Sequence, residues 1–290
     1  MADEPGGRWL EPRHHLLSWV LSLETARRHF TTTALVTDTV GAELLVEGLG
    51  LRFDEVSTQL DRLPASAAGW WGLGKLIAYG SQSRPFIHVD SDVYLWSPLP
   101  DRLVTAPVLG QNAELFVPGS SYYEPEALEA VLADGGWLPE EWRWIRNRPA
   151  PALGAVCCGI VGGTDVEFLA HYAAQASGLV TRDGNQRCLG QLRDCGEHMI
   201  VIEQFLLWAC LEYHRANPSS RFHDVRIEYL FPTEEKAYDG PASSAYTHLI
   251  GHAKRNQLIV NRLEARVRRQ YPQLAARVDR LAASSAPLIV

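Results

Sequence analysis

The segment PFIHVDSDVYLW, residues 85–96, decides the fold prediction. Its apolar run at 86–89 predicts a buried strand that breaks at Asp90 and Asp92. Burying two carboxylates costs free energy unless a cation compensates their charge. Side chains at positions i and i+2 of an extended segment point the same way, so both aspartates could reach one ion. Hard oxygen ligands suit Mg²⁺ or Mn²⁺, so the segment predicts a divalent-cation site, with a solvated turn after the strand as the alternative.

Strand and helix signals alternate on both sides of this segment. Short apolar or β-branched runs predict strands at 15–19, 32–38, 54–58 and 155–165. Helical patterns predict helices at 20–30, 41–50, 70–82, 166–176 and 199–216. This alternation is typical of an α/β fold with a mostly parallel sheet flanked by helices, which binds ligands at the carboxyl ends of its strands. The two aspartates would lie at such an end.

The remaining stretches are less regular. Residues 97–150 are rich in Pro, Trp and Tyr, which predicts one helix with long surface segments. Residues 180–198 are predicted to be a polar insertion, whose Cys188, Cys195 and His198 offer only three ligands at a spacing unlike that of zinc fingers. Residues 262–281 predict one amphipathic helix near the end of the chain, which could serve a homodimer.

Composition narrows the function classes. The chain has 290 residues and a formal net charge of -7, which argues against general binding of nucleic acid or anionic membranes. No apolar run reaches the ~18 residues that a membrane span needs, and the acidic, Pro/Gly-rich start does not resemble a signal peptide. Five cysteines, two of them adjacent, predict reduced thiols in a cytoplasmic protein.

A second motif, HLIGHAK at 248–254, follows the polar stretch 232–245 and is predicted to lie in a loop. The imidazole of His248 can complete the coordination shell of a cation. Gly251 permits close approach of the backbone to phosphate oxygens, and Lys254 supplies a positive charge to them. The motif therefore predicts a diphosphate clamp, with an ordinary polar loop as the alternative.

Taken in order, these motifs resemble those of GT-A glycosyltransferases: a hydrophobic strand, Asp-x-Asp, a glycine-rich strand end, an acidic-Gln pair and His-x-x-Gly-x-x-Lys. The last motif is most similar to that of the retaining glycogenin and bacterial galactosyltransferase group. The segments WWGLGKLIAY and PFIHVDSDVYLW also resemble uncharacterised bacterial glycosyltransferase-like proteins. The resemblance implies a GT-A, Rossmann-like domain at 15–256, between an N-terminal tail at 1–14 and a C-terminal helical extension at 257–290.

The resemblance also implies a role for each matching residue. Asp90, Asp92 and His248 would ligate Mn²⁺ or Mg²⁺, with Asp90 also near the ribose. Gly251 and Lys254 would contact the diphosphate. Further contacts to the donor nucleotide sugar are implied at Thr37, Asp38, Lys75, Gly159, Gly162 and Gly163.

Several of these roles have structural alternatives. Asp38 could equally cap the next helix, and Lys75 could be a solvated residue of an amphipathic helix. Glu203 and Gln204 match the acidic-Gln pair that faces the donor sugar, but they also open an apolar helix, where a glutamate suits the first turn. Asp165 or Glu203 would be the catalytic base if the reaction inverts configuration.

Two positions depart from the family pattern. Cys157-Cys158-Gly159 stands where retaining enzymes usually carry Asn-x-Gly, and Arg255 stands where a proline usually follows the lysine. Aromatic residues at 122–144 could line an acceptor site or pack in the core.

The predicted function is transfer of a sugar from a nucleotide-diphosphate donor, with UDP and retention of configuration favoured. The acceptor could be a carbohydrate, a peptide or a small metabolite. The alternatives are a nucleotidyltransferase or sugar-phosphate pyrophosphorylase, against which the absence of an N-terminal Gly/Lys phosphate loop counts, and a non-catalytic nucleotide-sugar-binding protein.

Overall fold

The computed structural model describes residues 9–64, 67, 69–119, 122–149, 152–190, 192, 194–239 and 245–284. The chain forms two compact units, each built from separate stretches of sequence. Unit 1 comprises Met1–Arg62, Val89–Leu99 and Pro241–Val290, and unit 2 comprises Leu63–His88 and Pro100–Gly240. The predicted boundaries at residues 14 and 256 stay predictions.

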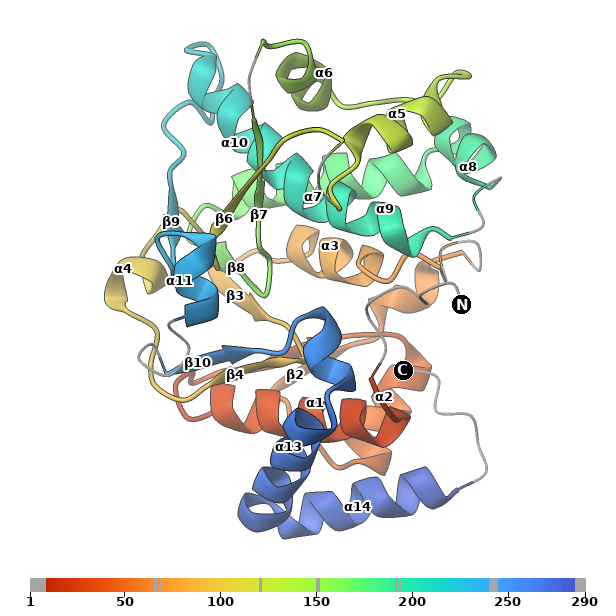
Figure 1. The fold of residues 1–290 in the computed structure, drawn as a ribbon, viewed down its shortest axis with the longest axis vertical. Coiled ribbons are helices and arrows are strands. Elements are labelled where there is room, and N and C mark those ends of the chain that lie inside the picture. Colours follow the sequence, from red (N-terminus) through yellow and green to blue (C-terminus); the bar gives the residue numbers. More distant parts are fainter. Residues whose placement is uncertain are drawn as a thin grey trace. The chain divides into compact units, whose positions relative to one another are not determined.

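Unit 1 packs helices against two short sheets (Figure 1). Its helical elements are α1 (Pro12–Ala26), α2 (Thr39–Ala42), the π-helix η1 (Glu43–Gly48), the 3-10 helices η2 (Gln59–Arg62) and η5 (Gly251–Arg255), α13 (Gln257–Gln270) and α14 (Pro272–Ala283). Strands β1 (Ala34–Val36) and β2 (Glu55–Ser57) pair in parallel, whereas β4 (Val93–Leu95) and β10 (Tyr246–His248) pair antiparallel.

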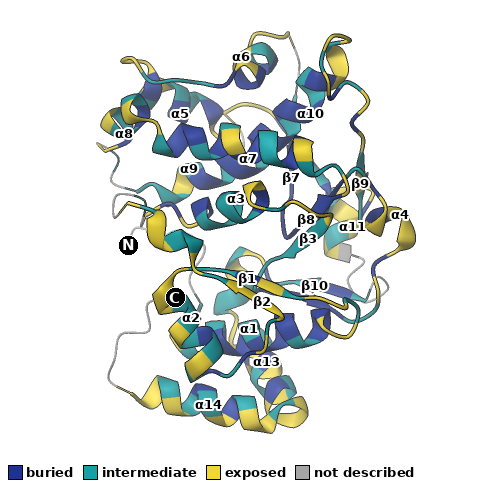
Figure 2. Cartoon of the chain, turned by 180° about the vertical axis from the view of Figure 1, so that it is seen from behind, coloured by how far each residue is buried: buried dark blue, intermediate teal, exposed yellow. Residues whose placement is uncertain are grey.

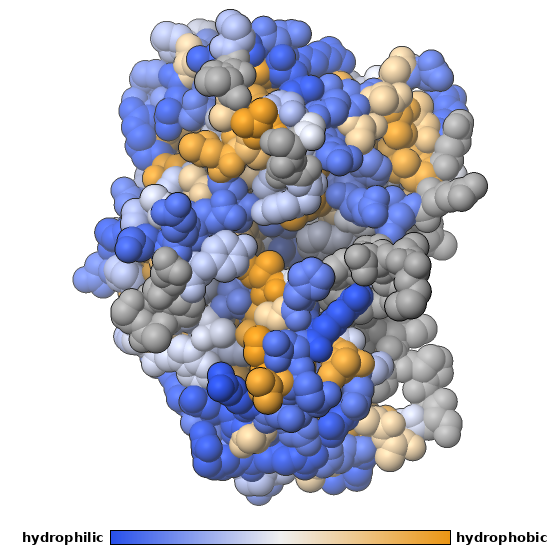
Figure 3. Space-filling view, in the orientation of Figure 1, coloured by the Kyte–Doolittle hydropathy of each residue, from blue (hydrophilic) through white to orange (hydrophobic). Residues whose placement is uncertain are grey.

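The core of unit 1 forms where α1 meets α13 and α14. Leu16, Leu17 and Val20 of α1 are almost fully buried, and Val267 and Val278 cover them from the two C-terminal helices. Figure 2 shows α1 mostly buried and α14 with a long exposed side. On the face shown in Figure 3, the surface over α14 is mainly hydrophilic. The helical extension therefore belongs to the core of unit 1, and the homodimer stays a prediction.

Unit 2 is mainly helical around one larger sheet (Figure 1). Its helices are α3 (Leu73–Gly80), α4 (Asp101–Val104), α5 (Pro125–Leu132), α6 (Glu140–Arg146), α7 (Val166–Thr181), α8 (Asp183–Leu189), α9 (Gly196–Ile200), the π-helix η4 (Val201–Phe205), α10 (Leu206–Ala216) and α11 (Glu234–Asp239). Its strands are β3 (Phe86–Val89, whose last residue is assigned to unit 1), β5 (Val108–Gly110), β6 (Ala113–Phe116), β7 (Leu153–Val156), β8 (Ile160–Gly163) and β9 (Ile227–Tyr229).

The larger sheet has the order β3-β8-β5-β9. Strand β5 pairs antiparallel with β8 and parallel with β9, and β6 and β7 form a separate antiparallel pair. Helices α3 and α7 pack closely, as do α6 and α10, around the buried side chains of Trp142, Tyr172 and Phe205. This packing holds α6, α7 and α10 together around one core.

The mixed α/β class predicted from the sequence is confirmed. The described strands form short sheets of mixed direction and show no long parallel central sheet. Among the described residues, no helix is long and apolar enough to cross a bilayer.

The predicted strand at 15–19 is wrong, because these residues belong to helix α1. The apolar residues Leu16, Leu17, Val20 and Leu21 lie on one helical face, and Pro12 begins the helix, where its missing N–H costs nothing. The single strand predicted at 155–165 is two strands, since β7 ends at Val156 and β8 begins at Ile160.

The single helix predicted at 262–281 is also wrong. Helix α13 ends at Gln270 and α14 begins at Pro272, because proline cannot continue the hydrogen bonding of the preceding helix. Residues 97–150 contain β5 and β6 in addition to three helices, where one helix was predicted. The polar insertion at 180–198 carries α8 and the start of α9. Residues 1–8 of the predicted tail and 240–244 of the polar stretch lie outside the described residues.

Candidate functional site

The two aspartates and His248 meet at one end of the β4–β10 pair in unit 1. Strand β4 begins at Val93, directly after the Asp-x-Asp turn, and its register sets Val93 opposite His248. The ligand atoms of Asp90, Asp92 and His248 lie within 4.8 Å of one another. His248 is therefore the last residue of a strand, not a loop residue as predicted, and strand pairing brings it to the aspartates.

Asp92 is the electrostatic centre of this cluster, and only 6% of the residue is exposed. Its Oδ2 lies 2.6 Å from Nζ of Lys254, and its Oδ1 lies 3.4 Å from Nε2 of His248. Burial alone would raise the pKa of Asp92, but the charges and hydrogen bonds of His248 and Lys254 outweigh burial and hold this pKa well below its ordinary value. Asp92 is therefore an ionised, buried carboxylate.

One oxygen of Asp92 is suited to accept a further partner. Within the described part of the chain, Oδ1 is buried and has no hydrogen bond of good geometry. A buried carboxylate oxygen without a hydrogen bond costs free energy, which a bound cation would remove.

Two buried serines of helix α1 donate hydrogen bonds to the backbone of the Asp-x-Asp turn. Ser22 donates a hydrogen bond to the carbonyl of Asp90 at 3.0 Å, and Ser18 donates one to the carbonyl of Ser91 at 2.7 Å. Sequence reasoning missed both serines. The available signal was their spacing of four residues, which places them on the same face of an otherwise apolar helix.

His15 of α1 also faces this turn. Its Nε2 lies 3.3 Å from Oγ of Ser91. Burial, together with the charge of Lys254, lowers the pKa of His15 to about 4. This imidazole is therefore neutral at neutral pH and adds no positive charge beside Asp92.

Gly251 and Lys254 of the predicted diphosphate clamp lie in the short helix η5, whereas His248 ends β10. Gly251 has φ +50, and among the described residues no atom would contact a Cβ built on it, so it serves the turn of the backbone and not close packing. Lys254 is paired with Asp92, and its ammonium also lies 5.9 Å from the ring centre of Trp9. The structure thus places the lysine of this motif at the carboxylate of Asp92.

The nearby donor-site candidates Thr37 and Asp38 have structural contacts. Asp38 accepts a hydrogen bond from the amide of Gly41 at 2.6 Å and caps α2, which is the alternative foreseen for it. The amide of Thr37 donates to the carbonyl of Ser57 at 2.9 Å and extends the β1–β2 pairing.

Two further candidates, Lys75 and Glu203, form an ion pair in unit 2. Nζ of Lys75 lies 2.7 Å from Oε1 of Glu203, whose side chain is fully buried. Tyr79 donates a hydrogen bond to the same oxygen at 3.2 Å. Gln204 accepts a hydrogen bond from the hydroxyl of Tyr123. Glu203 lies in the π-helix η4, a local widening of the helix that the sequence pattern did not indicate.

The other candidates in unit 2 have contacts within the fold. Asp165 caps α7 by accepting a hydrogen bond from the amide of Phe168 at 3.0 Å. A Cβ on Gly162 or Gly163 would lie 2.1 Å from a backbone oxygen of a neighbouring segment, so these glycines permit close strand packing. Gly159 lies in the bend between β7 and β8. The donor contacts predicted for these residues stay predictions.

The aromatic residues at 122–144 divide between surface and core. Trp142 is fully buried, whereas Tyr122 is exposed. The hydroxyls of Tyr122 and Tyr123 both donate to Oε2 of Glu114, at 2.6 and 2.7 Å.

The fold and the cluster define an α/β protein with a candidate cation site of two carboxylates and one imidazole. The chain belongs to DUF6734, a family of unknown function, whose model matches residues 2–281. No curated protein matches this chain.

Proposed function

We propose that this protein is a metal-dependent glycosyltransferase of the GT-A type that takes its sugar from a nucleotide-diphosphate donor, with UDP favoured. The observation that carries the proposal is the convergence of Asp90, Asp92 and His248 within 4.8 Å. His248 is more than 150 positions away from the two aspartates in the chain. They stand in the order expected for GT-A enzymes, which supports a shared origin for the site.

The donor set fits Mn²⁺ or Mg²⁺. Two carboxylates supply hard oxygen ligands, and one imidazole favours Mn²⁺ of the two ions. The buried Oδ1 of Asp92 is the oxygen that such an ion would satisfy. Asp90, Asp92 and His248 would hold the ion, and when bound it would offset the negative charge on the diphosphate leaving group.

Lys254 supports the same assignment. A cation at Asp92 would compete with the ammonium for Oδ2, and the flexible lysine side chain could then turn toward the diphosphate. Gly251, three residues earlier, sets the backbone turn that carries this lysine. The carboxylate thus has a positive partner both with and without the donor.

The contacts of Glu203 favour retention of configuration. An inverting enzyme needs an accessible carboxylate as a general base, and Glu203 is fully buried and paired with Lys75. Asp165 caps a helix. A retaining reaction does not require a strong protein base, because the leaving phosphate can take the proton.

The test is calorimetric titration of UDP in the presence and absence of Mn²⁺. We expect Mn²⁺-dependent UDP binding to the natural protein and loss of this binding in Asp92→Asn. Asp54→Asn is the matched control, since Asp54 is an exposed carboxylate of unit 1 that bonds to Thr33. Unchanged Mn²⁺-dependent binding of UDP to Asp92→Asn would contradict the assignment of Asp92.

A thermal-shift panel of nucleotide diphosphates and nucleotide sugars with Mn²⁺ would identify the donor, because a ligand that binds the native state raises its stability. Turnover of the responding donor would then separate a transferase from a non-catalytic binding protein. A protein that responds to no member of the panel would not be a glycosyltransferase of this type.

A further inference from the structure

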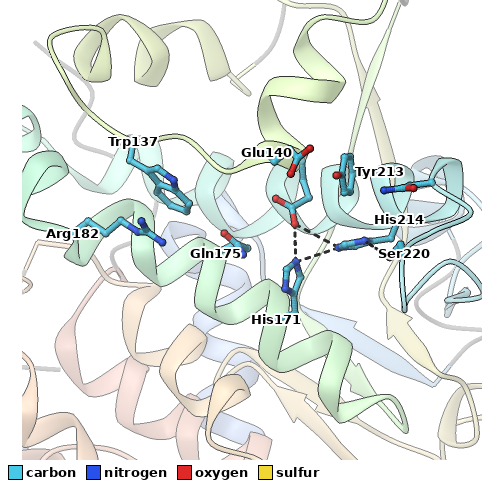
Figure 4. A pocket seen from close by; sticks show the side chains of 10 residues that line it. Trp137, Glu140, His171, Gln175, Arg182, Tyr213, His214 and Ser220 are labelled. Carbon is cyan, nitrogen blue, oxygen red and sulfur yellow. Dashed lines mark hydrogen bonds and ion pairs between the residues drawn. The ribbon is translucent and has the colours of Figure 1, made fainter.

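Unit 2 contains a second group of potential metal ligands, formed by Glu141, His171 and His214 (Figure 4). Nε2 of His171 lies 2.7 Å from Oε1 of Glu141, and Nε2 of His214 lies 3.5 Å from the same oxygen. The two Nε2 atoms are 3.2 Å apart. All three ligand atoms therefore face one point.

These separations match the edges of a coordination polyhedron. With metal–ligand distances of about 2.0–2.1 Å, neighbouring ligand atoms lie about 3.3 Å apart in a tetrahedron and about 2.9 Å apart in an octahedron. The observed 2.7, 3.2 and 3.5 Å bracket both values. Only small movements of the side chains would be needed to bind an ion.

Hydrogen bonds alone explain the cluster poorly. One N–H of His171 can point at Glu141, which satisfies the 2.7 Å contact. The same hydrogen also faces Nε2 of His214, which lies 3.2 Å from Nε2 of His171, so a single hydrogen is shared between two acceptors. A metal ion would serve all three groups at once, because both nitrogens would present lone pairs to it.

The ligands are held by rigid elements. Glu141 lies on α6, His171 on α7 and His214 on α10, and these helices share the main core of unit 2. Nδ1 of His214 lies 2.7 Å from Oγ of Ser220, which in turn accepts a hydrogen bond from the amide of Phe222 at 3.0 Å. A hydrogen bond from Nδ1–H to Ser220 would leave Nε2 without a proton, as a metal ligand requires.

The cluster borders a cavity of about 420 Å³. Figure 4 shows that Gln175 and Arg182 of the same cavity stand on one side of the cluster and Tyr213 on the other. Glu141 and His214 are almost completely buried, whereas His171 keeps 22% of its side chain exposed. Water or a small ligand with oxygen donors could therefore reach an ion at this position from the cavity.

We propose that Glu141, His171 and His214 bind a divalent transition-metal ion, such as Zn²⁺ or Fe²⁺, with at least one coordination position open to the cavity. Two imidazoles and one carboxylate are a donor set that these ions use in catalytic sites. The site differs in composition from the oxygen-rich cluster of unit 1.

The decisive experiment uses the natural full-length protein, stripped of metal with a chelator and loaded with one equivalent of Cu²⁺. Pulsed electron paramagnetic resonance counts the imidazoles bound to this ion. We expect two imidazoles, because the cluster of unit 1 supplies only His248. A count of one or none would overturn the proposal, and this measurement requires no variant to fold.

Titration of Co²⁺ into variants assigns the ligands. We expect His171→Ala and His214→Ala to lose the Co²⁺ absorption bands of this site, and Ser220→Ala to bind Co²⁺ about 10-fold more weakly, because Ser220 orients His214. Glu140→Gln is the matched control, since Glu140 lines the same cavity but is not one of the three ligands, and it should bind as the natural protein does. Unchanged Co²⁺ bands in both histidine variants would show that the cluster is a hydrogen-bond network only.

Discussion

The clusters of unit 1 and unit 2 each gather one buried carboxylate with further ligands, but they are built in opposite ways. In unit 1, Asp90 and Asp92 are neighbours in sequence, and strand pairing adds His248. In unit 2, Glu141, His171 and His214 come from three helices, 30 and 43 residues apart along the chain. The cluster of unit 1 could be recognised from two short motifs, whereas no motif marks the three single ligands of unit 2.

The two clusters also balance the charge of their carboxylate differently. Asp92 lies 2.6 Å from the ammonium of Lys254, a permanent positive charge. Glu141 is bonded to imidazoles, which are charged only when protonated. We therefore expect the first cluster to be stable without an ion and the second to gain more from one.

The largest expected effect is the selective loss of metal binding at one cluster while the other cluster keeps it. Asp92→Asn should abolish Mn²⁺-dependent UDP binding and leave the Co²⁺ bands of unit 2 unchanged. His214→Ala should do the reverse. The two effects are independent because each variant removes a ligand from one donor set only. Calorimetry with Mn²⁺ and absorption spectroscopy with Co²⁺ measure them, and loss of both signals in either variant would break the comparison.

A smaller effect, on the free energy of unfolding, is expected when the lysines paired with buried carboxylates are replaced. Lys75→Met should destabilise the protein by about 3 kcal/mol, because removing one partner of a buried ion pair leaves a charge in the core. Lys254→Met should cost less, since His248 still faces Asp92.

Urea unfolding of these variants measures the difference in free energy of unfolding. The chain has one further lysine, Lys236, which is exposed. Lys236→Met is the matched control and should leave stability unchanged. If Lys75→Met lowers the free energy of unfolding by less than about 1 kcal/mol, Glu203 is solvated or neutral. Glu203 would then again be a candidate for the general base.

The smallest change in stability is expected when a surface ion-pair network of unit 1 is removed. Arg268 bonds to both oxygens of Asp279 at 2.8 and 2.9 Å, and to Glu264 at 2.9 Å. Because Arg268 and Asp279 are exposed and Glu264 is partly exposed, Arg268→Gln should lower the free energy of unfolding by less than about 1 kcal/mol, and by less still in high salt.

The stabilisation by the Arg268–Asp279 pair should decrease as the pH falls. The hydrogen bonds from Arg268 hold the pKa of Asp279 below its ordinary value of 3.8, so their contribution is complete at neutral pH and is lost as the pH falls below 3.8. The stability gap between the natural protein and Arg268→Gln should therefore close in acid. A gap that stays constant from pH 7 to pH 2 would exclude the ionic contribution.

Much of the local structure was predictable, because it depends on neighbours in sequence. The helix at 70–82, the strands within 32–38 and 54–58, and the strand that ends before Asp90 all appear at the predicted places. The strand predicted at 15–19 failed because an apolar run of five residues fits a strand and a buried helix equally well. The strands β5 and β6 were missed because their pairing partners lie far along the chain.

The mixed α/β class and the position of the Asp-x-Asp turn follow from the amino-acid sequence, since apolar periodicity and a pair of carboxylates at i and i+2 are local properties. The folded structure was needed to show that His248 ends a strand beside this turn, that Glu203 pairs with Lys75, and that α6, α7 and α10 bring two histidines to Glu141. The motif at 248–254 indicated His248, but strand pairing and core packing join residues that are far apart in the chain, and no local pattern specifies which of them meet.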